Sequence, residues 1–306
     1  MRRLPRLYAF VVASIAMFVG AARAADDATF VPFDVPGSVF TTARDINASG
    51  DIVGRYLTPD GRQHGYLRTA DGAFTTIDYP GANLTAAIGI NPQGDIVGAF
   101  RVTGQAATSR HAFLLKDGVF TPFDCSGAIS TNVSGINAPG DIVGNYTAAD
   151  KTTHGFQYRD GACTAIDFPG AIETVAFKIT SQGVILGAYV APGGTTHDFV
   201  LDNGDYSTVE ISQPSIPSLD DGGINDRGDI VGWFCKTSAC AGVGDIIGFL
   251  LNDDGFHVVD VPGANCVSPL AINSRGEMAG AYSVTNACRD KHGFLLINNG
   301  GRGESH

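Results

Sequence analysis

Five of the seven histidines recur at one position of a repeating pattern, and an acidic residue follows four of them after a short hairpin. A two-residue hairpin turn places the residues on either side of it opposite each other, so each of these histidines faces a carboxylate. Such pairs could bind a metal or transfer protons, but a group needed once for catalysis would not be copied five times. We therefore predict structural histidine–acid pairs, namely His64–Asp78, His111–Asp124, His154–Asp167, His197–Glu210 and His292–Asp34.

Other motifs give no enzyme signature. The chain has no Gly-x-Ser-x-Gly elbow and no His-Glu-x-x-His helix. One aspartate follows the turn glycine of most repeats, and single carboxylates far from one another do not form a Ca²⁺ site, so we predict no metal and no cofactor. Five charged residues break the repeat near its first strand and are candidates for a channel that binds or cleaves polysaccharide, although drift of the repeat explains them equally well: Arg44, Asp45, Glu173, Lys178 and Asp221.

Trp233 is the only tryptophan in the chain. Its counterparts in the other repeats are three alanines, an asparagine and an arginine, so packing within the repeat does not require a large aromatic ring there. A lone indole beside a variable loop is a candidate platform for stacking a sugar ring, with local packing as the alternative. We therefore predict that Trp233 and Asp221 take part in ligand binding.

Six cysteines suit an oxidising compartment. Cys235 and Cys240 lie in one loop, whereas Cys266 and Cys288 lie in two loops that we expect on the same face. We therefore predict the disulfides Cys235–Cys240 and Cys266–Cys288. Cys125 ends one outer strand and Cys163 begins another, which predicts that they lie at opposite faces and stay free.

The strands and turns that position these residues are predicted by a short sequence that recurs along the chain. One copy is Gly89-Ile90-Asn91 followed by Pro-Gln-Gly-Asp-Ile-Val-Gly. Self-similarity at an interval of about 45 residues indicates a repeat architecture. We number the repeats units 1 to 6 by their Asn or Thr residues, which are Asn47, Asn91, Asn137, Thr180, Asn225 and Asn273.

Each unit reads as four short strands separated by turns, with a strong hairpin signal such as Asp117-Gly118 between the third and fourth. Four strands per repeat predict an all-β, six-bladed β-propeller of four-stranded blades. A β-solenoid or a string of sandwiches is less compatible with the hairpins and the lack of linkers. The last unit lacks a fourth strand, and a spare one precedes unit 1, so residues 30–34 should pair with residues 292–296 and close the ring.

The motifs His-Ala-Phe at His111–Phe113, His-Gly-Phe at His154–Phe156 and His292–Phe294, together with the Asn-x-x-Gly-Asp-Ile-Val-Gly phrase, resemble the HAF family of extracellular repeats in bacteria. This resemblance covers most of the chain and implies a secreted, propeller-like repeat protein. It implies no enzymatic activity, so no catalytic residue follows from it. The chain departs from the pattern at Lys178-Ile179-Thr180 in unit 4 and at Ile247, which stands where the other units have histidine.

The N-terminus has the features of a secretory signal peptide, with basic residues, an apolar run and Ala22-Arg23-Ala24 as a cleavage site. We predict a signal peptide over 1–24, one propeller domain over 25–297 and a flexible tail over 298–306. No later apolar run is long enough to span a membrane. The net charge of −11 disfavours nucleic acid and anionic lipid as partners.

Together these observations predict a secreted, monomeric and non-catalytic binding module whose partner is a carbohydrate or another extracellular protein. The alternative is a periplasmic or extracellular propeller enzyme that acts on polysaccharide by hydrolysis or elimination. The variable loops after the second and fourth strands lie on one face, and binding is expected there because loops on a rigid scaffold carry function.

Overall fold

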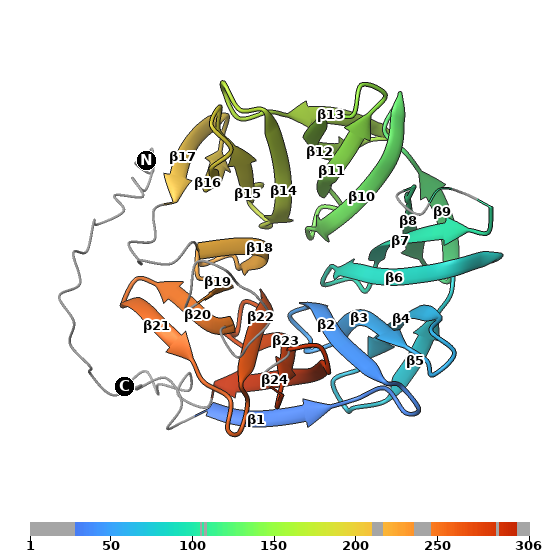
Figure 1. Ribbon diagram of the computed structural model, residues 1–306, viewed down its shortest axis with the longest axis vertical. Coiled ribbons are helices and arrows are strands. Elements are labelled where there is room, and N and C mark those ends of the chain that lie inside the picture. The colour runs from blue at the N-terminus through green and yellow to red at the C-terminus, as the bar shows by residue number, and fades with distance from the viewer. Residues whose placement is uncertain are drawn as a thin grey trace.

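Twenty-four strands joined by turns and loops make up the part of the chain that is described, and no helix occurs in it. The computed structural model describes residues 28–104, 106, 109–209, 217–235, 246–285 and 288–298. The strands form four sheets of four strands and one sheet of eight, which stand radially around a central axis (Figure 1). The chain is thus an all-β protein with the arrangement of a β-propeller.

In each unit the first strand lies nearest the axis and the fourth lies at the rim (Figure 1). Units 1 to 3 contain β2 (Phe40–Ile46), β3 (Ile52–Leu57), β4 (Gln63–Arg68) and β5 (Phe74–Ile77); β6 (Ala82–Ile90), β7 (Ile96–Val102), β8 (His111–Lys116) and β9 (Val119–Phe123); and β10 (Ala128–Ile136), β11 (Ile142–Ala148), β12 (Thr153–Arg159) and β13 (Ala162–Ile166). Units 4 to 6 contain β14 (Glu173–Ile179), β15 (Ile185–Val190), β16 (Thr196–Asp202) and β17 (Asp205–Val209); β18 (Pro217–Ile224), β19 (Ile230–Cys235), β20 (Ile246–Asn252) and β21 (Gly255–Val259); and β22 (Cys266–Ile272), β23 (Met278–Ser283), β24 (His292–Asn298) and β1 (Ala28–Phe33).

The eight-stranded sheet contains units 1 and 2. Strand β5 pairs with β4 in an antiparallel hairpin, as the fourth strand does in the other units. Strand β4 also makes one parallel bridge to β6 of unit 2, between Gln63 and Leu84. This single bridge merges the two sets of four strands into one sheet.

The Ile-Val-Gly stretch of the repeated phrase and the aromatic residue of the third strand fit together. Gly54 lies opposite Tyr66, and a Cβ atom on Gly54 would lie 2.7 Å from the Tyr66 ring. Gly98 has the same relation to Phe113, at 2.3 Å. Tyr66 and Phe113 are fully buried, so the glycine provides the space that a large core ring needs. Burial also raises the pKa of the Tyr66 hydroxyl far above its usual value.

The N-terminal strand closes the ring (Figure 1). Strand β1 pairs antiparallel with β24, with Phe30 opposite Leu296 and Phe33 opposite Gly293. The Phe30 ring packs edge-on against Tyr282 of the neighbouring strand, with the two centroids 5.4 Å apart. The predicted closure and its register are confirmed.

The prediction that Cys125 and Cys163 stay free was wrong, because they form a disulfide with a Cα–Cα distance of 5.5 Å. The reason is sheet twist: each strand is rotated relative to its neighbour, so the outer strands run around the rim rather than along the axis (Figure 1). The end of β9 therefore lies beside the start of β13. The Thr131 hydroxyl accepts a hydrogen bond of 3.2 Å from the Cys125 amide, which fixes Cys125 on unit 3.

This disulfide occupies the place of an aromatic pair. In units 2 and 4 the equivalent contacts are Tyr79 with Phe120, with centroids 5.3 Å apart, and Phe168 with Tyr206, at 5.2 Å. The sulfur bridge and the ring pair thus serve the same purpose, which is to fasten the incoming connection to the outer strand of the next unit.

We predict that Cys125→Ala with Cys163→Ala destabilises the protein by about 3–4 kcal/mol, because the bridge constrains a long loop of the unfolded chain. The double variant Cys125→Tyr with Cys163→Phe should recover part of that loss by recreating the aromatic pair of unit 2. Urea unfolding of both variants, beside the wild type, measures the two differences. A Tyr/Phe variant no more stable than the Ala/Ala variant would contradict the equivalence.

Two predicted segments lie mostly outside the described residues: the signal peptide over 1–24 and the tail over 298–306. Strand β24 extends to Asn298, one residue further than the domain boundary predicted from sequence. Within the described ranges, no helix is long and apolar enough to cross a membrane.

Candidate functional site at the ring axis

Two charged side chains from opposite sides of the ring meet at the axis. Asp45 of β2 and Lys178 of β14 occupy the same position of the repeat, immediately before the isoleucine that recurs in every unit. Their strands each carry a β-bulge just before this position, between Ala43 and Asp45 and between Ala176 and Lys178. A bulge bends a strand and re-aims its side chains, and here it directs both residues into the centre.

The two residues form an ion pair with 3.1 Å between Lys178 Nζ and Asp45 Oδ1. The side chains are only 10% and 14% exposed. Lys178 Nζ also donates to the Arg44 carbonyl at 3.3 Å, and the other Asp45 oxygen accepts from the Ile90 amide at 3.1 Å. A buried charge pair with these additional hydrogen bonds is well compensated, so neither group is poised as a free acid or base.

Small residues at the same repeat position leave room for this pair. Units 2, 3 and 5 have Gly89, Gly135 and Gly223 there. A Cβ atom on Gly135 would lie 3.3 Å from Lys178 Cδ. The space for a lysine that reaches across the ring therefore depends on glycine in the neighbouring units.

A recess of about 110 Å³ opens beside the ion pair on the face that carries the turns between first and second strands. The residues that line it include Asn137, Ser181, Asn225 and Asp226. One water needs roughly 10–15 Å³ by this measure, so the recess has room for several waters or a small polar group.

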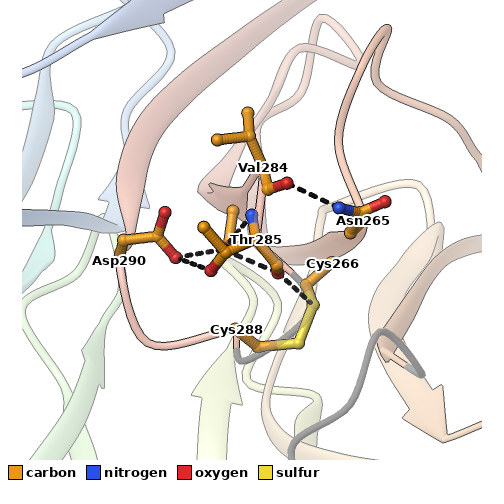
Figure 2. The surroundings of a disulfide bond; sticks show 7 residues. Asn265, Cys266, Val284, Thr285, Cys288 and Asp290 are labelled. Carbon is orange, nitrogen blue, oxygen red and sulfur yellow. Dashed lines mark hydrogen bonds between the residues drawn. A yellow bond between two sulfur atoms is a disulfide. The ribbon is translucent and has the colours of Figure 1, made fainter.

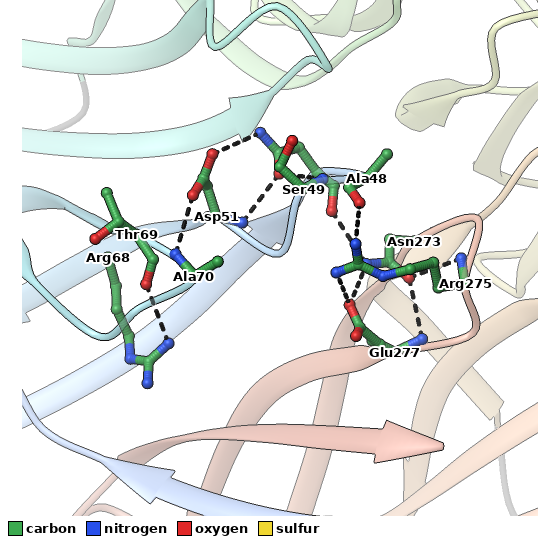
Figure 3. Close-up of polar contacts among 10 residues, drawn as sticks. Ala48, Ser49, Asp51, Arg68, Thr69, Ala70, Asn273, Arg275 and Glu277 are labelled. Carbon is green, nitrogen blue, oxygen red and sulfur yellow. Dashed lines mark hydrogen bonds and ion pairs between the residues drawn. The ribbon is translucent and has the colours of Figure 1, made fainter. Parts of the chain in front are cut away.

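The asparagine of each phrase links neighbouring units at this face. In the joint between units 6 and 1, the Asn273 amide donates to the Asn47 carbonyl at 3.0 Å and to Glu277 at 2.7 Å (Figure 3). Its oxygen accepts from the amides of Arg275 and Glu277, both at 3.0 Å. One side chain thus shapes its own turn and holds the next unit. The same amide-to-carbonyl contact joins units 1 and 2, 3 and 4, and 5 and 6.

An arginine strengthens the joint that closes the ring. Arg275 donates to the Ala48 carbonyl of unit 1 at 2.5 Å and pairs with Glu277, as Figure 3 shows. Arg227 does the same one joint earlier, donating to the Ser274 carbonyl at 3.1 Å. In unit 3, the Arg159 guanidinium holds the pKa of Asp141 below its usual range. The aspartates after the turn glycines therefore stabilise turns and joints.

Unit 4 has Thr180 where the other units have asparagine, and the joint to unit 5 uses another contact. The Asp226 carboxylate accepts from the Ser181 amide at 2.8 Å and from the Ser181 hydroxyl at 2.6 Å. Sequence reasoning missed Asp226. The available signal was Thr180 itself, because threonine lacks the amide that spans the joint in four other places.

The histidine–acid contacts occur on the opposite face. Nδ1 of each histidine lies 2.7–2.8 Å from a carboxylate oxygen in the pairs His64–Asp78, His111–Asp124, His154–Asp167 and His292–Asp34. An aromatic ring from the end of the second strand packs on the imidazole, as Tyr56 does on His64 with centroids 5.1 Å apart. His197 stacks on Tyr189 in the same way, while its predicted partner Glu210 lies outside the described residues. Repetition with the same neighbours identifies a structural role.

The remaining candidates from sequence do not gather at the axis. Glu173 begins β14 and is exposed, at the other end of that strand from Lys178. Arg44 lies in the bulge of β2, where its carbonyl contacts Lys178. Asp221 lies on β18, and its side chain is outside the description. Trp233 lies half-buried on β19, opposite Gly248 of β20.

The predicted Cys266–Cys288 disulfide is present, with a Cα–Cα distance of 5.7 Å (Figure 2). It fastens the loop after β23 to the start of β22. The Asp290 carboxylate accepts from the hydroxyls of Ser283 and Thr285, which lower its pKa. Cys235 is also in a disulfide, and its predicted partner Cys240 lies outside the described residues. Within the described part of the chain, no group of three or more His, Cys, Asp or Glu residues could hold a metal ion.

Comparisons with known proteins show the fold alone. No protein-family model matches the chain, and no curated protein matches it in sequence. The crystal structure of AofleA from Arthrobotrys oligospora matches with a TM-score of 0.51 at 11% identity, over 89% of this chain and 93% of that one. A variant of the Aleuria aurantia lectin in complex with Fucα1-6GlcNAc matches with a TM-score of 0.50 at 10% identity, over 88% of this chain and 100% of that one. TolB from Acinetobacter baumannii matches with a TM-score of 0.54 at 14% identity, over 81% of this chain and 64% of that one. The chain is thus similar in fold to these three proteins, one of which is a lectin.

Proposed function

We propose that this protein is a secreted, non-catalytic glycan-binding module. The observation that carries the proposal is the environment of Trp233. At the same repeat position Ala99, Ala188 and Ala281 are only 2–4% exposed, so a methyl group fills the junction between units. The much larger indole at this position stays half-buried and faces unit 6, because its cross-strand partner Gly248 packs against Pro269 of β22.

A partly exposed indole on a rigid strand is suited to stacking on the apolar face of a sugar ring. It is held by β-sheet pairing on both sides, to Ser218 of β18 and Gly248 of β20, so little conformational freedom is lost on binding. The lectin among the structures of similar fold supports the choice of a carbohydrate, and its ligand makes fucosides the first glycans to test.

The ionisable groups at the axis support binding rather than catalysis. Asp45 and Lys178 neutralise each other, and the repeated histidines are bonded to carboxylates. Polysaccharide hydrolysis or elimination is the alternative function. A reducing-end assay and an absorbance assay for unsaturated products, run on every glycan that binds, test it directly.

We expect Trp233→Ala to weaken glycan binding about tenfold, because the sugar ring loses its stacking partner. This corresponds to roughly 1.4 kcal/mol of binding free energy. The measurement is a glycan array that includes fucosylated and acidic glycans, followed by calorimetry on the best ligand. Trp233→Phe is the matched control, since it keeps an aromatic face and should retain most of the affinity. Wild-type affinity in a folded Trp233→Ala variant would remove this site.

Two further parts of the proposal, export and family membership, rest mainly on sequence. The segment over 1–24 supports export, and the disulfides suit an oxidising compartment. The His-x-Phe and Asn-x-x-Gly-Asp motifs support membership of the HAF repeat family. Detection of the processed chain outside the cytoplasm of the producing cell, beginning near Ala25, would test the export.

We also infer that the propeller has six blades, with the eight-stranded sheet counted as two. The inference is supported by the single bridge between Gln63 and Leu84, against six paired positions between β3 and β4. Hydrogen exchange tests it. Amides at the β4–β6 contact should exchange faster than those between β3 and β4, and equal protection would indicate one continuous sheet.

A further inference from the structure

Two arginines lie across from each other at the junction between units 2 and 3. The β7–β8 register has Phe100 opposite His111 as its outermost pair, so the next residues outward are Arg101 and Arg110. They lie on the same side of the sheet as Ala99 and Ala112, and that side packs against unit 3. Both side chains are half-buried.

The backbone of Arg110 is fixed to unit 3 at this junction. Its amide donates to the Ser130 hydroxyl at 3.2 Å, and its carbonyl accepts from the Thr131 amide at 2.9 Å. The backbone from which the Arg110 side chain extends is therefore held in place. Ile129, the neighbour of Ser130 on β10, is 52% exposed.

Like charges that face each other across two strands are destabilising. The other units avoid this at the same register, with neutral pairs such as Leu57 with Gln63 or Val190 with Thr196. Burial and the nearby Arg101 lower the pKa of the Arg110 guanidinium below its usual value. The carboxylate of Asp124, the residue after β9, is hydrogen-bonded to His111.

We propose that Arg101 and Arg110 form a binding site for the anionic group of an acidic sugar, a uronate carboxylate or a sulfate ester. Guanidinium groups match the planar geometry of such oxyanions and bind them in bidentate fashion. An oxyanion between the two arginines would relieve their repulsion. The net charge of −11 disfavours nonspecific binding of polyanions to the rest of the surface.

This inference rests on the proposed glycan-binding function and adds a second site, apart from Trp233, whose ligand class is an acidic sugar. The probes are a short oligogalacturonate, the same oligosaccharide with its carboxylates methyl-esterified, and a sulfated oligosaccharide. We expect the oligogalacturonate or the sulfated sugar to bind at least about tenfold more tightly than the ester, with a preference that falls as salt is raised. Comparison of the two anionic probes identifies which oxyanion the site takes.

The variants are Arg101→Gln, Arg110→Gln and the double change, with Arg62→Gln as the matched control. Arg62 lies exposed in the β3–β4 loop of unit 1, which corresponds to the loop between the two arginines in unit 2. The site variants should lose the preference for the anionic probe and keep any binding of the neutral ester. The control should retain the preference.

A thermal measurement separates a binding role from a structural one. Without ligand, Arg110→Gln should raise Tm by about 1–2 °C, because it removes a repulsion between neighbouring strands. A lower Tm in that variant, or an anionic preference that survives the double change, would overturn the proposal. Equal binding of the anionic and esterified probes would overturn it while leaving glycan binding intact. If no glycan binds at all, the proposed function fails and this inference fails with it.

Discussion

Replacing Lys178 by methionine should destabilise the protein by about 3–5 kcal/mol, because it leaves the Asp45 carboxylate buried near the axis without its counter-charge. Methionine keeps the length of the side chain, so the loss comes from the charge rather than from a cavity. Urea unfolding gives the free energy of unfolding of the variant. An unchanged m-value would show that unfolding exposes as much surface in the variant as in the wild type.

The double variant Asp45→Asn with Lys178→Met tests whether the two groups act as a pair. Asparagine still accepts from the Ile90 amide, and no charge is left unpaired. Its stability should lie closer to the wild type than that of Lys178→Met alone, which is a favourable coupling in the double-mutant cycle. Additive losses in the two single variants would mean that the ion pair contributes nothing specific.

Deleting residues 28–33 should lower Tm by more than about 10 °C and promote aggregation. The deletion removes every backbone pair between β1 and β24, leaves an exposed sheet edge and uncovers the Phe294 side of unit 6. Differential scanning calorimetry and light scattering measure the two effects.

A synthetic peptide with the sequence of β1 provides the control for this deletion. If the missing strand is the cause, adding the peptide in excess should raise Tm towards the wild-type value, because it binds the folded ring and not the unfolded chain. A scrambled peptide should have no effect. A deletion variant that melts at the wild-type temperature would show that the side-chain packing between units 6 and 1 is sufficient for closure.

Local patterns predicted much of this fold because each unit repeats the same signals. The turn after Asn91, the buried Ile96 and Val97, and the hairpin at Asp117-Gly118 each fix a short element without reference to the rest of the chain. Closure followed from a count of strands, since a spare one at the N-terminus matched a missing one at the end. The contacts His64–Asp78, His111–Asp124 and His154–Asp167 followed from hairpin register, and His292–Asp34 followed from ring closure.

Contacts between units could not be predicted from such local patterns. The Cys125–Cys163 disulfide depends on the accumulated twist that brings the end of one outer strand to the start of the next, and that angle is a property of the whole sheet. Asp45 and Lys178 were both singled out as departures from the repeat, but their contact was not foreseen. It needs the geometry of the ring, which places units three apart on opposite sides of the axis.

The position of that ion pair has a consequence for how the gene can change. Repeat genes readily gain or lose whole copies by unequal recombination, and most joints between these units would accept such a change because they use the same asparagine contact. Loss or gain of one unit between Asp45 and Lys178 would move the two charges out of opposition and leave both buried without a partner. Selection for a folded product would then act against such a change in the number of repeats.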